Sequence, residues 1–222
     1  IDKEGFCSVI MEGRGIPAKG AFPSSFTYGN DAVETVSYDP EEAKKLLEES
    51  GWTDTDGDGY VDKDGQKLTI NWLTYPTRLE QPKLAEYAQA TLKEIGIDVS
   101  VNNTSDHRTY AENGEFDVYV SSLTTAPTGD PEYFFSSTVT GAKNYGNYQN
   151  DEVTKLTEQL HQTFDTDERG KLAVELQQKI LDDDAYFFVS HLNMGIVTKA
   201  NVTGMAAHPC DYYEITADLD VQ

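Results

Sequence analysis

Cysteine is scarce in this chain: there are two among 222 residues, and Cys7 and Cys210 lie near opposite ends of the sequence. Two cysteines do not amount to the disulfide framework that stabilises many small secreted domains. A single bridge between them would close a very long loop, which is worth roughly 4–5 kcal/mol in the chain-entropy model. Both a bridge and two unpaired buried thiols are compatible with the sequence.

Long apolar runs and positive charge are also scarce. No apolar stretch approaches the roughly 20 residues that a membrane-spanning helix needs. The chain has 17 Lys and Arg against 39 Asp and Glu, a formal net charge of −22. This acidity argues against nucleic acid and anionic membrane surfaces as partners, because like charges repel. The hydrophobic fraction is 38%, with 13 Tyr and 9 Phe, so a packed core is still expected.

The motifs of common enzyme classes are missing. There is no G-x-S-x-G, no P-loop and no G-x-G-x-x-G, and the four histidines form no H-x-x-x-H or HExxH pair. Acidic residues are so abundant that any two could be proposed as a glycosidase pair, which makes that proposal uninformative. Hydrolase remains a rival class. His208 lies two residues before Cys210, and we keep it as a candidate metal ligand because borderline metals favour these residue types.

The predicted elements between residues 68 and 123 follow the order strand, helix, strand, helix, strand. The segments "QKLTINWLTYP", "IDVSVNN" and "FDVYVSSL" are rich in β-formers, and helical spacing relates Leu84, Ala88, Leu92 and Ile95. This order is typical of a βαβ layer with right-handed crossovers. The sequence therefore predicts an α/β fold.

Further helices are predicted on either side of this layer. "DPEEAKKLLEESGW" has Asp39 as its N-cap and Pro40 in its first turn. A later helix starts near residue 167, with Thr166 or Asp167 as its cap. The helix before it has one apolar face that consists of Val153, Leu156, Leu160 and Phe164. The segment "AYFFVSHLNMGIVTK" is predicted as a buried strand or strand pair.

"DTDGDGYVDKDG", from Asp54 to Gly65, matches much of a calcium-binding loop. Gly59 falls at position 6, where the backbone must turn sharply. Calcium takes six to eight oxygen ligands, and this spacing supplies most of them. The candidate ligands at positions 1, 3, 5, 7 and 9 are Asp54, Asp56, Asp58, the carbonyl of Tyr60, and Asp62.

The loop departs from an EF-hand at position 12, where Gly65 replaces the bidentate Glu. The segment after it is predicted as a strand rather than a second helix, which excludes a paired calcium sensor. A single structural calcium site and an Asp/Gly turn without metal both remain open. In either case we expect the loop to lie away from the main functional site.

Several segments in the same order resemble the family 5 extracellular solute-binding proteins, which serve ABC importers of oligopeptides, dipeptides and nickel chelates. Each motif alone is modest, but five in the right order are specific, and they cover essentially the whole chain. They are "IDKEGFCSVIMEGRGIPAKGAFP", "YDPEEAKKLLEESGWTDTDGDGYVDKDGQKLTI", "AEYAQATLKEIGIDVSV", "GEFDVYVSS" and "DEVTKLTEQL".

The resemblance implies a lobe of the type II periplasmic-binding-protein fold, with a mixed sheet flanked by helices. It implies a complete protein of roughly twice this length or more, with two lobes joined by a hinge. The chain would then be a mature product or an excised piece. We expect residues 1–198 to form the second lobe, and residues 199–222 to return toward the hinge and the missing first lobe.

The resemblance also implies a ligand site in the loop after "FDVYVSS", beyond the carboxyl end of a strand. Aromatic residues that contact the chelate in nickel-binding members are absent here, around Thr124 and Thr128. Tyr145 and Tyr148 either supply such contacts or simply pack, and the tail residues 211–213 either approach the cleft or belong to a hinge strand. The predicted ligand-binding residues are Ser122, Thr124, Thr125, Thr128, Tyr145, Tyr148, Asp211, Tyr212 and Tyr213.

The function that the resemblance implies is capture of nickel or a metal chelate outside the cell membrane, for delivery to the membrane subunits of an ABC permease. The alternative is an oligopeptide or dipeptide as the solute, and a hydrolase or a calcium-binding module are further alternatives. No covalent chemistry and no cofactor are expected, apart from structural calcium. We expect an extracytoplasmic lipoprotein, anchored to the membrane through the missing N-terminus.

Overall fold

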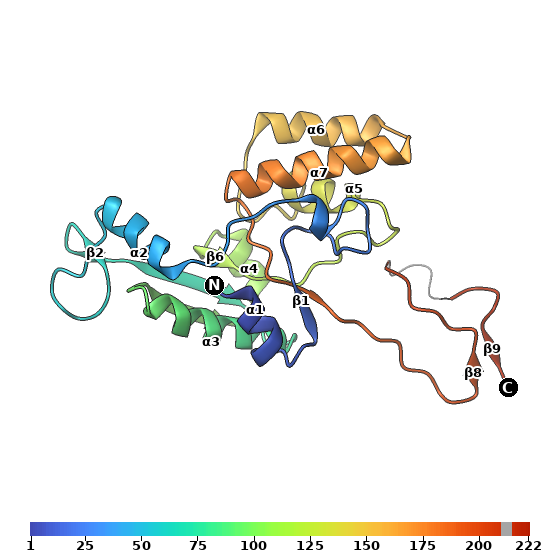
Figure 1. Cartoon of the computed structure of the whole chain (residues 1–222), viewed down its shortest axis with the longest axis horizontal. Coiled ribbons are helices and arrows are strands. Elements are labelled where there is room, and N and C mark those ends of the chain that lie inside the picture. The colour runs from blue at the N-terminus through green and yellow to red at the C-terminus, as the bar shows by residue number, and fades with distance from the viewer. Residues whose placement is uncertain (210–214) are drawn as a thin grey trace. The chain divides into compact units, whose positions relative to one another are not determined.

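The computed structural model describes residues 1–209 and 215–222 (Figure 1). These residues divide into two compact units, and neither unit is one continuous stretch of sequence. Unit 1 consists of Ile1–Glu12 and Val36–Leu123, and unit 2 consists of Gly13–Thr35 and Thr124–Gln222. The expected division of the longer protein at residue 198 stays a prediction. None of the described helices is long and apolar enough to cross a membrane.

The centre of unit 1 is a parallel sheet with the strand order β5-β4-β6. β4 (Thr69–Thr74) pairs with β5 (Asp98–Asn103) along its whole length, and with the short β6 (Val118–Tyr119) on its other side. α3 (Glu80–Lys93) connects β4 to β5, and α4 (His107–Glu112) connects β5 to β6. This order confirms the predicted α/β class. The described antiparallel pairings lie in separate two-stranded ribbons.

The helices of unit 1 follow from local sequence signals. α3 packs against β5 and β4 through a face that includes Leu84 and Ala88, as the helical spacing predicts. α2 (Pro40–Glu49) begins after Asp39, whose carboxylate accepts hydrogen bonds from the N–H groups of two first-turn residues, so the predicted cap is confirmed. The remaining elements are α1 (Lys3–Gly5), η1 (Phe6–Ile10), β2 (Asp62–Lys63) and β3 (Gln66–Lys67).

Unit 2 is built around two long helices, α6 (Asp151–Gln162) and α7 (Thr166–Asp182), which lie side by side (Figure 1). Their core is aromatic: Phe22 is fully buried and meets the rings of Tyr28, Phe134 and Phe135 edge-on. The other elements are β1 (Gly15–Pro17), paired with β7 (Ser190–Leu192), η2 (Asn30–Ala32), α5 (Glu132–Phe134), η3 (Phe135–Val139), β8 (Val202–Thr203) and β9 (Asp220–Val221).

Three local predictions in unit 2 are wrong. Phe164 does not share the buried face of α6: it is 92% exposed, because the helix ends at Gln162 and Thr163 is extended (φ −95°, ψ 126°). Asp165, rather than Thr166 or Asp167, caps α7 by accepting hydrogen bonds from two backbone N–H groups. In the segment predicted as a buried strand or strand pair, β7 covers only three residues, and these are half-buried.

Candidate functional site

The carboxyl ends of β4 and β6 bring polar and aromatic side chains together in unit 1. Tyr75 follows β4 and is 7% exposed, and its hydroxyl accepts a hydrogen bond from the backbone N–H of Ser122 at 3.1 Å. The Ser122 hydroxyl donates to Glu80, the first residue of α3, at 2.8 Å. Ser122, which the sequence predicts as a ligand contact, is therefore held in place by two neighbouring elements.

Gln81 lines the same edge from inside. Its side chain is 4% exposed, and its amide lies 2.8 Å from Ser122 Oγ in either orientation of the amide O and N atoms. Glu80 and Gln81 open α3, so the helix points its first turn at the residues beyond β6. A buried amide without a hydrogen-bond partner would cost free energy, so the Gln81 amide restricts the position of Ser122.

His107 joins this edge from the start of α4. Its ring stacks on Tyr75, with ring centroids 4.1 Å apart and planes 24° apart, and its Nδ1 lies 2.7 Å from the Tyr119 hydroxyl. Burial lowers the pKa of His107 below its ordinary value, and the nearby positive charge of Arg108 acts in the same direction, which favours the neutral imidazole. We name Tyr75, Glu80, Gln81, His107, Tyr119 and Ser122 the edge cluster.

Ser122 is the one member of the edge cluster that was predicted from the sequence. A sequence signal was present for two of the others: Tyr75 directly follows a predicted strand, and His107 opens the short helix after another. Ligands of α/β proteins bind beyond the carboxyl ends of strands. This rule was applied only to the last of the three strands. Applied to the first two strands as well, it points to Tyr75 and His107.

The loop after residue 123 belongs to unit 2 and carries three predicted ligand contacts. Thr124 and Thr128 are exposed and Thr125 is half-buried. The Tyr28 hydroxyl donates to the carbonyl oxygen of Gly129 at 2.6 Å. Gly129 has φ +82°, which favours glycine, and its N–H closes a turn onto residue 126.

Arg169 of α7 holds the end of this loop. Its Nε and Nη2 donate to the two carboxylate oxygens of Asp130 at 2.7 and 2.6 Å, and Nη2 also donates to Glu132 at 2.9 Å. Its Nη1 donates to the carbonyl oxygens of Leu160 and Thr163 at 2.6 and 2.5 Å. Burial is the largest single influence and opposes ionisation of both acids. The hydrogen bonds and charge of Arg169, together with the backbone N–H of Glu132 at Asp130 and with His161 at Glu132, outweigh it, so the pKa of both acids is lowered.

The two predicted tyrosines differ in their surroundings. The Tyr148 hydroxyl donates to the carboxylate of Asp183 at 2.6 Å, and its half-buried ring packs against the core of unit 2. Burial and the Asp183 carboxylate both raise the pKa of Tyr148. Tyr148 lines a cavity of about 310 Å³. The residues that line this cavity do not include Tyr145, Thr124, Thr125 or Thr128. Tyr145 is half-buried, and its backbone N–H donates to the carbonyl of Lys143.

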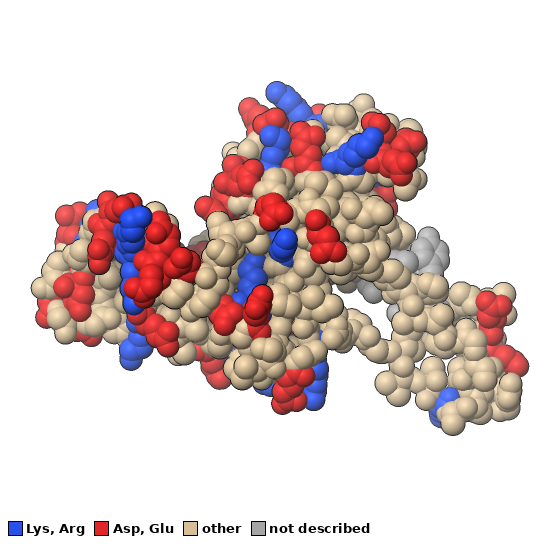
Figure 2. All heavy atoms as spheres, in the orientation of Figure 1, with Lys and Arg blue, Asp and Glu red and all other residues tan. Residues whose placement is uncertain are grey.

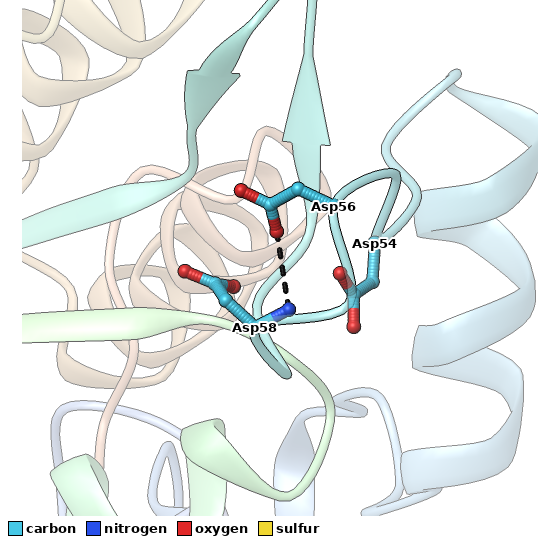
Figure 3. A group of neighbouring side chains, drawn as sticks. All are labelled: Asp54, Asp56 and Asp58. Atoms are coloured by element: carbon cyan, nitrogen blue, oxygen red, sulfur yellow. Dashed lines mark hydrogen bonds between the residues drawn. The ribbon is translucent and has the colours of Figure 1, made fainter.

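The acidic loop of unit 1 brings its first three aspartates together (Figure 3). One carboxylate oxygen from each of Asp54, Asp56 and Asp58 lies within 4.8 Å of the others, and all three residues are exposed. Asp54 accepts hydrogen bonds from the N–H groups of Gly57 and Gly59 at 2.7 and 3.0 Å. Gly59 has φ +88°, as the sharp turn predicted at this position requires.

Two of the predicted calcium ligands of this loop, Asp62 and Asp58, have further partners within the chain. Asp62 accepts hydrogen bonds from the N–H and hydroxyl of Thr55 at 2.8 and 2.7 Å. Asp58 pairs with Lys67 at 2.5 Å, and the Lys67 ammonium also lies over the ring of Tyr60. The hydrogen bond from Lys67 lowers the pKa of Asp58. A calcium ion at this loop stays a prediction, as does the turn without metal.

The predictions for the tail remain open. His208 is exposed. Cys210, Asp211, Tyr212 and Tyr213 lie outside the described residues, so the thiol pairing and the predicted ligand contacts of the tail are not tested. Cys7 is buried in unit 1, and burial raises the pKa of its thiol.

Comparisons with known proteins agree on one family. Residues 1–146 match the model described as bacterial extracellular solute-binding proteins, family 5 middle. The chain is 32% identical to the oligopeptide-binding protein AppA of Bacillus subtilis, over 97% of this chain and 41% of that protein. It is 27% identical to the nickel-binding protein NikA of Staphylococcus aureus, over 97% of this chain and 42% of that protein. The chain thus spans about two-fifths of these relatives.

Solved structures give the same result. The structure of Bacillus subtilis AppA in complex with a nonapeptide has a TM-score of 0.77 at 26% identity, over 96% of this chain and 44% of that one. The nickel ABC transporter structure from Bacillus halodurans has a TM-score of 0.78 at 28% identity, over 100% of this chain and 46% of that one. The type II periplasmic-binding-protein fold predicted from the sequence is confirmed by these neighbours.

Proposed function

The chain belongs to the bacterial extracellular solute-binding proteins of family 5, and we propose that the protein containing it is the substrate-binding component of an ABC importer. It captures a small solute outside the cell membrane and delivers it to the membrane subunits of the permease. The first lobe is supplied by sequence outside this chain, which spans about two-fifths of its relatives. A lipid anchor holds the protein at the membrane.

The edge cluster is the observation that carries this proposal. It lies at the carboxyl edge of a parallel sheet, where α/β proteins bind ligands. It offers hydroxyl and amide groups, aromatic rings and one carboxylate, which suits an organic solute better than a bare ion. Within the cluster the Ser122 hydroxyl donates to Glu80, and His107 Nδ1 lies against Tyr119. The described cluster thus contains no serine activated by a histidine, which favours binding over hydrolysis.

Nickel or a metal chelate is the first candidate for the solute. Acidic side chains outnumber basic ones over the face seen in Figure 2, and the net charge of −22 attracts cationic solutes. One relative at 27% identity is named a nickel-binding protein. The edge cluster contributes a single imidazole, so the metal would arrive with its own chelating molecule rather than be held by protein ligands alone.

A peptide is the second candidate. The relative at 32% identity is named an oligopeptide-binding protein, and a similar solved structure holds a nonapeptide. The residues between Tyr119 and Asp130 are all uncharged. A loop of hydroxyls and backbone groups can bind a peptide main chain without selecting its side chains.

Native mass spectrometry of the full-length protein, purified from its own host, tests the proposal. We expect a co-purifying species: a nickel isotope pattern identifies a chelate, and a distribution of short peptides identifies the alternative. Ser122→Ala should reduce the loaded fraction, whereas the neighbouring exposed Ser121→Ala serves as the matched control. Turnover of a hydrolase substrate by solute-free protein would contradict the proposal.

A further inference from the structure

Residues 124–131 form neither helix nor strand, yet several contacts hold them. Ala126 and Pro127 are buried, and the carbonyl of Gly129 accepts a hydrogen bond from Tyr28. Asp130 is the last polar anchor, and its partner Arg169 lies 39 positions later on α7. The exposed threonines 124 and 128 therefore belong to a segment whose far end is held by the Tyr28 hydrogen bond and by the ion pair of Asp130 with Arg169.

All the N–H groups of the Arg169 guanidinium donate hydrogen bonds within the protein. A guanidinium has five N–H donors. Three of the hydrogen bonds reach Asp130 and Glu132, and two reach the carbonyls of Leu160 and Thr163 at the end of α6. Leu160 lies in the last turn of α6 and Thr163 directly follows the helix, where intrahelical partners run out. The side chain is 14% exposed, and no donor is left over for a solute.

The ion pair also involves the acidic residue nearest to the loop threonines. Residues 124–129 are uncharged, so Asp130 is the acidic group nearest to the threonines in sequence. Its two oxygens both accept hydrogen bonds from Arg169, which also donates to Glu132. Lysine cannot replace this arrangement, because an ammonium lacks the planar fork that contacts both carboxylate oxygens at once.

We propose that Arg169 is a positioning residue for solute binding: it orders residues 124–129 through Asp130, without touching the solute. The assignment rests on the proposed function in so far as the loop threonines contact the solute. The ordering of the loop by Arg169 stands on the contacts alone.

Hydrogen exchange of the full-length protein tests the ordering. In Arg169→Lys we expect the amides of Gly129 and Glu132 to exchange about tenfold faster or more, since charge-assisted hydrogen bonds are lost. The amides of the buried stretch of α7, from Leu172 to Ile180, should keep their wild-type rates. Unchanged exchange in the loop, or equal acceleration everywhere, would overturn the proposal.

Two further variants keep the result interpretable. Lys171→Ala is the matched control, because Lys171 is an exposed cation on the same helix that pairs with Glu168. Asp130→Asn removes the loop's half of the ion pair and leaves the bonds from Arg169 to the end of α6, so it decides the matter if Arg169→Lys fails to fold. We expect the same loop-selective acceleration in Asp130→Asn and none in Lys171→Ala.

The loaded fraction seen by native mass spectrometry separates the two proposals. If wild-type protein carries a solute, Arg169→Lys should retain several-fold less of it while Lys171→Ala retains as much as wild type. Full retention in Arg169→Lys would overturn the positioning role. If wild-type protein carries no solute and gains none, the proposed function fails, and hydrogen exchange still decides whether Arg169 orders the loop.

Discussion

Tyr75 and Ser122 are 47 positions apart, and the backbone N–H of Ser122 donates to the Tyr75 hydroxyl at 3.1 Å. Tyr75 follows β4 and Ser122 lies just beyond β6, so the bond joins the ends of two neighbouring parallel strands. Ser122 then donates its own hydroxyl to Glu80. The edge of the sheet is therefore organised by the chain itself, before any solute arrives.

Tyr75→Phe should destabilise unit 1 by about 1 kcal/mol, the usual net value of one hydrogen bond. The ring and its stacking on His107 are kept, so the loss reports on the hydroxyl alone. Urea unfolding of the full-length protein measures the change, with Tyr38→Phe as the control at a 47% exposed tyrosine. Equal stability of Tyr75→Phe and wild type would show that the bond to Ser122 contributes nothing.

Truncation of two phenylalanines of unit 2 should change the free energy of unfolding by very different amounts. Phe22 is fully buried among four aromatic rings, so Phe22→Ala should cost about 3–5 kcal/mol. Phe164 is 92% exposed, and Phe164→Ala should change the free energy of unfolding by less than about 0.5 kcal/mol. Denaturant titration compares the two. A large loss in Phe164→Ala would mean that this side chain is covered in the longer protein.

The network around Arg169 predicts a loss of stability in acid. The pKa values of Asp130 and Glu132 lie below their ordinary values of 3.8 and 4.5 in the folded state. A carboxyl with a lowered folded pKa stabilises the fold above its unfolded pKa, and this contribution is lost as pH falls through the folded value. The free energy of unfolding should therefore decline below pH 4.5.

Asp130→Asn isolates this contribution. The variant lacks one of the two titrating partners of Arg169, so its stability should depend less steeply on pH in the same acid range. Thermal or urea unfolding between neutral pH and pH 3 would measure both curves. Parallel curves for wild type and Asp130→Asn would contradict a role for the Asp130 carboxylate.

Calcium should raise the thermal midpoint of the protein and leave its secondary structure unchanged, if the acidic loop binds it as a single structural site. A ligand that binds only the folded state stabilises it in proportion to the logarithm of its concentration over Kd. Asp56→Asn should abolish the shift, while Asp64→Asn, outside the aspartate group, should keep it. If the thermal midpoint does not change when calcium is added, the loop is an Asp/Gly turn without metal.

The 222-residue chain by itself should bind solutes weakly. In the proposed two-lobed protein the closed form is favoured by contacts from both lobes, and a solute shifts the equilibrium by its differential affinity for that form. Calorimetry with a nickel–histidine complex and with a nonapeptide should show weak heats or none. Tight binding of either probe by the isolated chain would mean that this part already holds the complete site.

Local features of the fold were predictable because their causes are local. Asp39 reaches N–H groups two and three residues away, and β4 lies where the sequence is rich in β-formers. The prediction that Phe164 is buried was wrong for a related reason. The helical spacing continues in the sequence, but α6 ends two residues before Phe164. Because Thr163 is extended, the Phe164 side chain lies away from the buried face.

The sequence by itself determined the order of strands and helices, because spacing and turn chemistry act over a few positions, and its resemblance to known segments gave the family. Ser122 as a site residue stays a prediction. The tertiary structure alone decided that Tyr75 and His107 join Ser122, and that Arg169 holds Asp130 from 39 positions away. Such partners are chosen by the packing of whole elements, and the local pattern does not say which arginine or tyrosine fills each role. Only the folded backbone brings one of each within hydrogen-bonding distance.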